Sequence, residues 1–410
     1  MTDYQSDLLR LLNDRGYIHQ LTDAEGLDAL ASKQVVPGYI GFDMTADSLH
    51  VGNLVSIMLL RRLQQAGHKP IVVIGGGTTK VGDPSGKDEV RKLIDNDGIA
   101  KNIASIQRCF GNFLTFGNGP TDAVIINNAD WLDKLEYISF LRDVGRHFTI
   151  NRMLTFDSVK LRLEREQPLT FLEFNYMILQ AYDFLELARQ HDCRLQLGGS
   201  DQWGNIVNGI ELARRIDGAE LFGVTTPLIT KSDGSKMGKS VDGAIWLNAD
   251  RMSPYDYWQF WRNTDDRDVG RFMRIFTDID LEEIVRLEAL EGSEINEAKK
   301  ILADAATAMA HGEGAAKDAA TTAQTTFEEG KSGADLPMFE TSESEISILN
   351  ALVSIGFCAS KGEAKRLVAG GGARIDDEQI KDAGFMIELS NEDRKISAGK
   401  KKHGLLMKSD

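Results

Sequence analysis

Two short segments far apart in the chain carry side chains suited to phosphate chemistry. Residues 47–53 have the sequence DSLHVGN, and residues 236–240 have the sequence KMGKS. His50 falls where a strand-like run gives way to a helical one, so backbone amides and the helix dipole there could face an anion. Lys236 and Lys239 stand three residues apart in a loop that contains glycine and serine. Because neither segment supplies a nucleophile, the pair predicts phosphate binding without covalent catalysis.

Each of these residues alone has a plainer interpretation. A single histidine is more often an ordinary surface or core residue, and two lysines in a loop are more often only solvated. Gly52 beside His50 weakens that interpretation, because glycine lets a phosphate approach the backbone while a histidine donates a hydrogen bond to it. A lysine pair such as Lys236 and Lys239 suits a departing pyrophosphate, since ammonium groups can close over phosphates in the transition state.

A third group of polar residues follows helical spacing. Tyr176, Gln180 and Asp183 are separated by four and three positions, which puts all three on one helical face. A polar stripe of this kind usually faces solvent. Its neighbours Met177 and Phe184 are strongly apolar, however, so the stripe is also compatible with the wall of a polar pocket.

Glycine-rich segments give weaker signals. Residues 199–205 (GSDQWGN) follow a strand-like run and predict either a strand-end binding loop or an ordinary turn. Residues 75–77 begin like a dinucleotide fingerprint, but Lys80 stands at its final glycine position. Residues 82–87 resemble the end of a P-loop, but Asp88 stands where that motif needs serine or threonine. Neither phosphate motif is complete.

Composition limits the class of protein. At 410 residues the chain is long enough for two or three domains. A net charge of −15 argues against non-specific coating of nucleic acid, although basic residues gather locally in the tail. The cysteines Cys109, Cys193 and Cys358 lie far apart and have no histidines at ligand spacing, so we expect neither disulfides nor a structural metal. No signal-type or membrane-length apolar stretch occurs, which predicts a cytoplasmic protein without a membrane partner.

The order of elements predicts the fold class. Strand-like runs at 39–42, 71–74, 123–126 and 193–197 alternate with helical windows, one of which, residues 54–65, is closed by Gly67. This alternation is typical of an α/β domain with a doubly wound parallel sheet, whose ligands sit at the carboxyl ends of the strands.

The remainder of the chain divides differently. Residues 253–327 follow a helical pattern without a strand-like run, and residues 328–344 have the composition of an exposed linker. A compact unit then follows, in which residues 346–353 are amphipathic, Ser360 opens a second helix with capping-box spacing, and residues 373–375 are strand-like.

Taken together, these segments resemble one family. Residues 50–53 (HVGN) match the HIGH signature of class I aminoacyl-tRNA synthetases, and residues 236–240 match their KMSKS signature. More specific are GFD at 41–43, GDPSGK at 82–87 and LQAYD at 179–183, together with the GSDQWGN segment. The chain resembles the bacterial tyrosyl-tRNA synthetases from about Arg15 to the C-terminal unit.

The resemblance implies an organisation and an activity. It implies a Rossmann-like catalytic domain at 1–230, with an inserted helical connecting and dimerisation segment at about 130–185. It also implies a lysine loop and helical anticodon-side domain at 231–327, a linker at 328–344, and at 345–410 a small α+β RNA-binding domain like that of ribosomal protein S-four. The implied enzyme activates L-tyrosine with ATP to tyrosyl-adenylate and pyrophosphate, and then transfers tyrosine to the 3′-terminal adenosine of tRNA(Tyr). It would be a homodimer that uses Mg²⁺ with ATP, holds no protein-ligated metal and binds no DNA.

The resemblance also implies site residues. Those for tyrosine would be Tyr39, Asp83, Tyr176, Gln180, Asp183 and Gln202, with Tyr39 and Asp183 on the phenol, Gln202 near the carboxylate and the other three on the ammonium group. Those for ATP would be Asp43, His50, Gly52, Asn53, Asp201, Lys236 and Lys239. The catalytic set would be Thr45, His50, Asn53, Lys87, Arg91, Lys236 and Lys239. Contacts to tRNA would come from Lys361, Lys365 and Arg366.

Four positions depart from the family pattern. Asn53 replaces the second histidine of the signature, and Ile40 stands where many relatives have a cysteine near the ribose. Met44 replaces a common proline, and Gly238 replaces the serine of the generic lysine loop. The first three departures could change ATP affinity without changing the reaction.

Two other function classes stay open at this point. A non-catalytic RNA-binding protein could keep a vestigial synthetase fold, although such a protein has no need of an intact His50, Lys236, Lys239, Asp83 and Asp183. A generic nucleotidyltransferase would leave the tyrosine-binding residues and the C-terminal unit unexplained.

Overall fold

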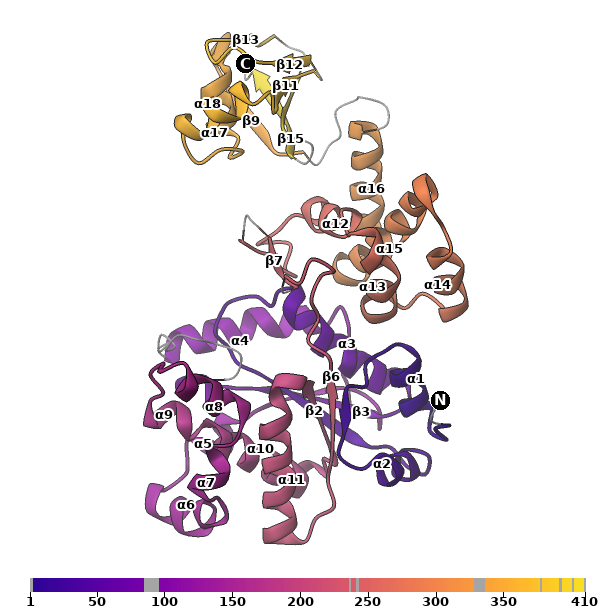
Figure 1. Cartoon of the computed structure of the whole chain (residues 1–410), viewed down its shortest axis with the longest axis vertical. Coiled ribbons are helices and arrows are strands. Elements are labelled where there is room, and N and C mark those ends of the chain that lie inside the picture. The colour runs from indigo at the N-terminus through magenta and orange to yellow at the C-terminus, as the bar shows by residue number, and fades with distance from the viewer. Residues whose placement is uncertain are drawn as a thin grey trace. The chain divides into compact units, whose positions relative to one another are not determined.

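The computed structural model describes residues 3–84, 96–235, 237–240, 243–327, 336–376, 378–390, 393–399 and 402–408. It divides into two compact units, which are shown in Figure 1. Unit 1 comprises Met1–Ser253 and Phe260–His311, and unit 2 comprises Pro254–Gln259 and Gly312–Asp410. The domain boundaries drawn from the sequence stay predictions. Among the described residues, no helix is both long and apolar enough to cross a membrane.

Unit 1 contains a six-stranded sheet in the order β1-β6-β5-β2-β3-β4. All neighbours pair in parallel except β1, which runs antiparallel to β6. The strands are β1 (Gln20–Leu21), β2 (Pro37–Phe42), β3 (Lys69–Ile74), β4 (Val124–Asn127), β5 (Leu195–Gly199) and β6 (Phe222–Thr226), and a separate short pair is formed by β7 (Lys239–Ser240) and β8 (Gly243–Ala244). The four strand-like runs of the sequence all correspond to strands of this sheet, and the predicted fold class is confirmed.

Helices connect and cover these strands. Those of unit 1 are α1 (Asp7–Asp14), α2 (Ala24–Ala31), α3 (Val51–Gln65), α4 (Asn96–Phe110), α5 (Ala129–Leu132), α6 (Tyr137–Asp143), α7 (Ile150–Met153), α8 (Asp157–Glu164), α9 (Phe171–Phe174), α10 (Tyr176–His191), α11 (Trp203–Asp217), α13 (Val269–Phe276), α14 (Leu281–Glu288) and α15 (Ile295–His311), while α12 (Pro254–Arg262) spans the division between the units. The helical pattern predicted from residue 253 onward is confirmed.

The topology creates a crevice at the carboxyl ends of β2 and β5. The connection from β2 through α3 to β3 and the connection from β5 through α11 to β6 run in opposite directions along the sheet. Because such crossovers are right-handed, α3 and α11 cover opposite faces of the sheet. The strand order therefore reverses between β2 and β5, which is where ligands bind in folds of this class.

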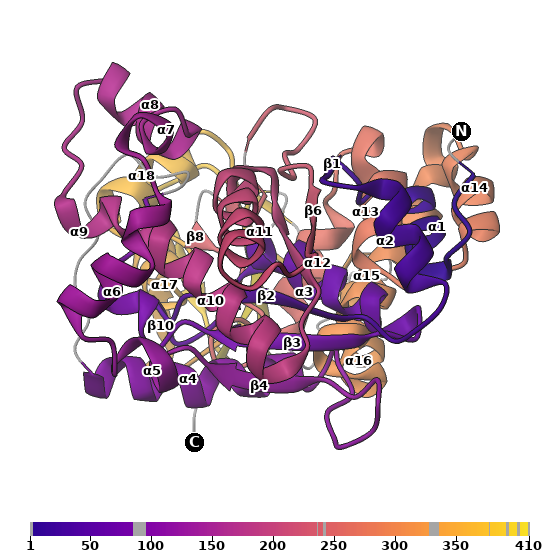
Figure 2. The same ribbon diagram turned by 90° about the horizontal axis from the view of Figure 1, so that it is seen from below.

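The α10 face of the sheet holds a large apolar core. Helices α10 and α11 lie side by side in both Figure 1 and Figure 2. Tyr39 and Ile71 of the sheet pack in one buried cluster with Ala181, Phe184 and Leu185 of α10. The apolar residues between Tyr176, Gln180 and Asp183 thus fix the helix that carries this polar stripe.

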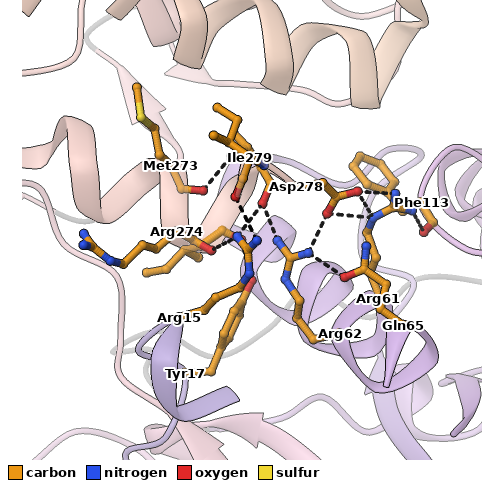
Figure 3. A network of polar contacts seen from close by, with 12 residues as sticks. Arg15, Tyr17, Arg61, Arg62, Gln65, Phe113, Met273, Arg274, Asp278 and Ile279 are labelled. Carbon is orange, nitrogen blue, oxygen red and sulfur yellow. Dashed lines mark hydrogen bonds and ion pairs between the residues drawn. The ribbon is translucent and has the colours of Figure 1, made fainter. Parts of the chain in front are cut away.

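Helix α3 joins the crevice to the helical part of unit 1. It begins at Val51, three residues before the predicted start, and Gly67 follows its end with a φ of +81°, as a C-terminal glycine should. At that end Asp278 accepts hydrogen bonds from Arg61 (3.0 Å) and from Arg62 (2.5 Å), whose side chain is only 1% exposed (Figure 3).

The same network closes the C-terminal end of α13. Arg15 donates to the carbonyl oxygens of Arg274 (3.2 Å), Thr277 (3.0 Å) and Ile279 (2.9 Å), and Tyr17 donates to that of Ile275 (Figure 3). Cationic donors at a helix C-terminus satisfy its last carbonyl groups and complement its dipole. The network therefore fastens α3 to α13.

Unit 2 ends in a compact α+β fold. Its elements are α16 (Glu313–Phe327), β9 (Met338–Thr341), β10 (Glu345–Ser347), α17 (Ile348–Ser354), α18 (Lys361–Ala369), β11 (Ala373–Ile375), β12 (Glu378–Ile380), β13 (Met386–Glu388), β14 (Arg394–Ala398) and β15 (Lys402–Lys408). A five-stranded sheet has the order β12-β11-β14-β15-β9, and β10 pairs with β13. The sequence predicts one amphipathic run over residues 346–353, but the first two lie in β10 and only the rest are helical. Ser360 caps α18 as predicted, by accepting from the Glu363 amide at 3.3 Å.

Candidate active site

A cavity of about 420 Å³ lies at the crevice between β2 and β5. Its lining includes twelve residues predicted for the tyrosine, ATP and catalytic sites, namely Tyr39, Asp43, Thr45, His50, Gly52, Asn53, Asp83, Tyr176, Gln180, Asp183, Asp201 and Gln202. These come from the ends of β2, β3 and β5 and from α3 and α10. A larger cavity of about 530 Å³ lies beside α13 and α14, and none of the predicted site residues lines it. The smaller cavity is therefore the candidate active site.

One end of the cavity presents a buried carboxylate. Asp183 is 4% exposed and accepts hydrogen bonds from Asn128 Nδ2 (2.9 Å) and Trp131 Nε1 (2.7 Å). Burial raises the pKa of Asp183 to about 7, although the two hydrogen bonds oppose this rise. Asn128 and Trp131 were not predicted from the sequence. Only the position of Asn128, directly after a strand, could have pointed to it.

Two buried polar atoms at this end have no hydrogen-bond partner among the described residues. They are the hydroxyl of Tyr39, which is 1% exposed, and Oε1 of Gln196. Both residues line the cavity, and they stand opposite each other in the pairing of β2 with β5. Because buried polar groups in proteins are nearly always hydrogen-bonded, such atoms mark a place for polar groups of a ligand. Gln196 was not predicted as a site residue.

The middle of the cavity is acidic and hydrogen-bonded. Asp43 accepts from the Tyr176 hydroxyl (3.3 Å) and the Thr78 hydroxyl (3.0 Å). Asp83 accepts from Gln202 Nε2 (3.0 Å). With Asp183 and Asp201, four carboxyl groups line the cavity, which suits a cationic group of a ligand.

Two amides complete this region. Gln180 Nε2 donates to Gln202 Oε1 (3.2 Å), and Asn205 Nδ2 donates to Gln180 Oε1 (2.9 Å). The predicted ammonium-site residues therefore share one cavity, but Gln180 contacts Gln202 and Tyr176 contacts Asp43. Asn205 was not predicted, although it lies within the GSDQWGN segment.

The other end of the cavity is the N-terminus of α3. His50 is the N-cap residue, and its Nδ1 accepts a hydrogen bond from the Gly52 amide (3.0 Å). Asn53 Oδ1 accepts from the His50 amide (3.2 Å), so Asn53 completes a capping box. Because Nδ1 is an acceptor, the proton of the neutral imidazole lies on Nε2. His50 can thus donate from Nε2 to an anion at the helix N-terminus.

The lysine loop meets this helix end. Gly238 has a φ of +95°, and a Cβ atom at this position would lie 2.5 Å from the Gly52 amide nitrogen. A Cβ atom on Gly52 would in turn lie 3.2 Å from the Met237 carbonyl oxygen. The two motifs that stand far apart in the sequence are therefore in contact through glycine backbone. Lys87, Arg91 and Lys236 lie outside the described residues, and only the backbone of Lys239 is described.

The predicted tRNA contacts lie in unit 2. Lys361, Lys365 and Arg366 are exposed on α18, whose Ala364 and Val368 are buried. Their spacing therefore leaves three cations on the solvent side of one helix. Among the described residues, no group of three or more histidine, cysteine, aspartate or glutamate side chains could hold a metal ion.

Comparisons with known proteins identify the family. Residues 33–328 match the family described as tRNA synthetases class I (W and Y). The chain is 68% identical over 409 residues to the tyrosine–tRNA ligase of Novosphingobium aromaticivorans, with 100% of both chains covered. It is 66% identical over 406 residues to that of Zymomonas mobilis, with 99% of both chains covered.

A solved structure agrees with these sequences. The C-terminally truncated mitochondrial tyrosyl-tRNA synthetase of Aspergillus nidulans superposes with a TM-score of 0.71 at 28% identity, over 80% of this chain and 95% of that one. The family match covers well over half of the chain, and the sequence relatives cover nearly all of it. This chain belongs to the bacterial tyrosyl-tRNA synthetases, within class I of the aminoacyl-tRNA synthetases.

Proposed function

We propose that this tyrosine–tRNA ligase carries out its reaction in the 420 Å³ cavity, with the side chain of L-tyrosine between Tyr39 and Asp183. The observation that carries this assignment is the buried Tyr39 hydroxyl, which has no partner among the described residues, in a cavity that also holds the buried Asp183 carboxylate. The tyrosine phenol both donates and accepts a hydrogen bond. It would donate to Asp183 and accept from Tyr39.

Discrimination against phenylalanine follows from the same contacts. Phenylalanine in this position would leave a buried carboxylate and a buried hydroxyl without their partner, which costs far more than a lost methylene contact. Tyrosyl-tRNA synthetases are themselves the standard example of this rule. Asp43, Asp83 and Tyr176 supply the acidic surroundings for the substrate ammonium group.

Activation needs orientation and charge stabilisation. The tyrosine carboxylate attacks the α-phosphorus of ATP, the bond to pyrophosphate breaks, and tyrosyl-adenylate forms. His50 Nε2 and the first amides of α3 would bind the departing phosphates together with Thr45, and Asp201 would hold the ribose. The lysines of the loop, with Lys87 and Arg91, would surround the pyrophosphate. Mg²⁺ would enter with ATP and neutralise phosphate charge.

Transfer then completes the reaction. A hydroxyl of the 3′-terminal adenosine of tRNA(Tyr) attacks the tyrosyl carbonyl carbon, and AMP leaves. Lys361, Lys365 and Arg366 would contact phosphates of the same tRNA, since exposed cations on one helix suit a polyanion. ATP and tRNA as substrates, with the free cysteines Cys109, Cys193 and Cys358, support a location in the cytoplasm.

The proposed partner chain is a second copy of this protein. Large exposed apolar side chains recur in α6–α9 and directly after α7, namely Tyr137, Ile138, Ile150, Leu154, Leu161, Leu163, Phe171 and Leu172. Extensive exposed apolar surface is typical of subunit interfaces. We propose a homodimer that uses this surface.

Pyrophosphate exchange tests the assignment. Purified protein with ATP should exchange labelled pyrophosphate in the presence of tyrosine and not of phenylalanine or tryptophan. Exchange that depends on tryptophan alone would overturn the tyrosine site. His50→Ala should slow adenylate formation by about 10²-fold, the usual effect of removing one transition-state donor. An unchanged rate with weaker ATP binding would refute the role given to His50.

A further inference from the structure

Residues 245–247, just after the lysine loop, pair with the signature segment that contains His50. The Val51 amide donates to the Ile245 carbonyl (2.8 Å), and the Leu247 amide donates to the Leu49 carbonyl (2.9 Å). The Ile245 amide donates to the Gly238 carbonyl (3.1 Å). Ile245 therefore hydrogen-bonds both the first turn of α3 and the lysine loop.

The residue opposite His50 in this pairing is Trp246. Residues directly opposite each other in an antiparallel pair project to the same side. Accordingly the centroids of the imidazole and indole rings are 6.2 Å apart, and the ring planes form an angle of 63° in an edge-to-face arrangement. This contact restricts rotation of the His50 ring about its side-chain bonds, while the Gly52 amide holds Nδ1.

Trp246 is also contacted by a charged residue, which is itself part of an ion pair. The Arg251 guanidinium lies 4.8 Å from the centre of a Trp246 ring. Arg251 also forms an ion pair with Asp47 at 3.0 Å. Asp47 stands three residues before His50. The chain of contacts from Asp47 through Arg251 and Trp246 to His50 therefore starts and ends within residues 47–53. The turn that carries Arg251 is held by hydrogen bonds from the Arg251 and Met252 amides to the Asn248 carbonyl.

We propose that Trp246 is a positioning residue for His50 in tyrosine activation, and that Arg251 and Asp47 hold Trp246 in place. The proposal rests on the proposed function, in which His50 donates a hydrogen bond to a phosphate group of ATP. Misplacing a catalytic group by a fraction of its hydrogen-bond length lowers the rate without changing which substrate binds. Trp246 acts through His50 and not on the substrate, and this distinction makes the proposal testable.

The experiment is a double-mutant cycle on the rate constant of tyrosyl-adenylate formation. Trp246→Leu should slow this step about tenfold, with an unchanged dissociation constant for tyrosine. Trp246→Phe, which keeps an aromatic edge against His50, should slow it no more than about threefold. In a His50→Ala background, Trp246→Leu should have almost no further effect, because the group that it positions is absent.

Arg251→Met provides a second variant, which removes the contacts of Arg251 with Trp246 and Asp47 while both of those residues stay in the chain. It should slow activation about threefold, and this effect too should vanish in the His50→Ala background. The matched control is Arg267→Met, which removes an exposed arginine whose ion-pair partner is Asp265 and not Asp47. Additive effects of Trp246→Leu and His50→Ala, or an unchanged rate in both Trp246→Leu and Arg251→Met, would overturn the proposal. Tyrosine-dependent exchange by the unaltered protein tests the proposed function separately.

Discussion

At the scale of single residues, folding changes the acidity of Asp183. An aspartate in an unfolded chain ionises near pH 4, whereas burial raises the pKa of Asp183 to about 7. The folded, ligand-free protein therefore takes up a proton at Asp183 when the pH falls through about 7. The ionised carboxylate of Asp183 carries no proton, so it can accept hydrogen bonds from Asn128, Trp131 and a tyrosine phenol at the same time. The protonated form would itself be a hydrogen-bond donor at one oxygen.

This shift predicts a pH dependence of tyrosine binding. The dissociation constant for tyrosine, measured by calorimetry without ATP, should rise about tenfold between pH 8 and pH 6, because protonated Asp183 loses an acceptor. Asp183→Asn should bind tyrosine weakly at both values and show no such change. A wild-type profile as flat as that of the variant would contradict the role of Asp183.

The glycine at position 238 shows a second residue-scale effect. Its φ of +95° is costly for a residue with a side chain, and a Cβ atom there would collide with the Gly52 amide. The serine of the generic lysine loop would therefore push the loop away from α3. Contact with the Gly52 backbone therefore explains why glycine replaces the serine of the generic signature at position 238.

Gly238→Ser should consequently slow tyrosyl-adenylate formation about tenfold, with little change in tyrosine affinity. Gly234→Ser is the matched control, because Gly234 also has a positive φ (+82°) but a Cβ atom there would have nothing within 4 Å among the described residues. Rapid-quench measurement of the rate of tyrosyl-adenylate formation in both variants separates the effect of collision with Gly52 from the effect of backbone strain at a positive φ. Equal slowing of the two would show that contact with Gly52 is unimportant.

At the scale of elements, α3 is one continuous helix that joins the crevice to the helical part of unit 1. Its first turn forms the proposed anion site, and its last turn is fastened to α13 through Asp278 and two arginines. Burial alone would raise the pKa of Asp278, but hydrogen bonds and charge from Arg61 and Arg62 lower it to about 2. A carboxylate with a lowered pKa stabilises the folded state above its unfolded pKa, and this stabilisation is lost as the pH falls through the folded value.

Asp278→Asn should therefore lower the free energy of unfolding by about 1–2 kcal/mol at pH 7, a value reduced for partial solvent exposure. The difference from the wild type should shrink as the pH is lowered from about 4 towards about 2. Chemical denaturation at pH 7 and at pH 3 measures it. Asp7→Asn removes an exposed aspartate paired with Arg10 and should change stability by less than about 0.5 kcal/mol. An equal loss at both pH values would mean that the charge of Asp278 is not what matters.

At the scale of the whole molecule, the apolar surface of α6–α9 predicts association. Phe171 is 68% exposed, so a charged residue there should not disturb the fold of the monomer. Phe171→Glu should shift the protein from dimer to monomer in sedimentation velocity. Val285→Glu is the control, since Val285 is 59% exposed on α14 and should leave the dimer intact. A monomeric wild type, or a dimer that tolerates Phe171→Glu, would exclude this surface as the interface.

Much of the molecule was predictable because its signals are local. Four strands of the sheet, the caps of α3 and α18 and the single polar face of α10 follow from alternation, capping residues and helical spacing in neighbouring residues. His50 and Asp183 were singled out in the same way, whereas Asp83 was singled out only through the family resemblance. Matching several such segments at once was enough to predict the family.

Contacts between distant segments were not predictable from those signals. Asn128 and Trp131 reach Asp183 from more than fifty positions away, and nothing near them in the sequence marks them as its partners. Trp246 also gave no signal, because an indole in a loop is usually a packing residue. The pairing of residues 245–247 with residues 49–51 alone brings it to His50.

The sequence by itself determined which chemical groups this synthetase contains and which helix or strand carries each of them. Those properties depend on residue type and on spacing over a few positions. The tertiary structure alone decided which groups meet. It set the pKa of Asp183 through burial by many neighbours, buried the Tyr39 hydroxyl without a hydrogen-bond partner among the described residues, and joined the segments around His50 and Gly238 through glycine backbone. Desolvation and contact are properties of the folded surroundings, and no local segment contains them.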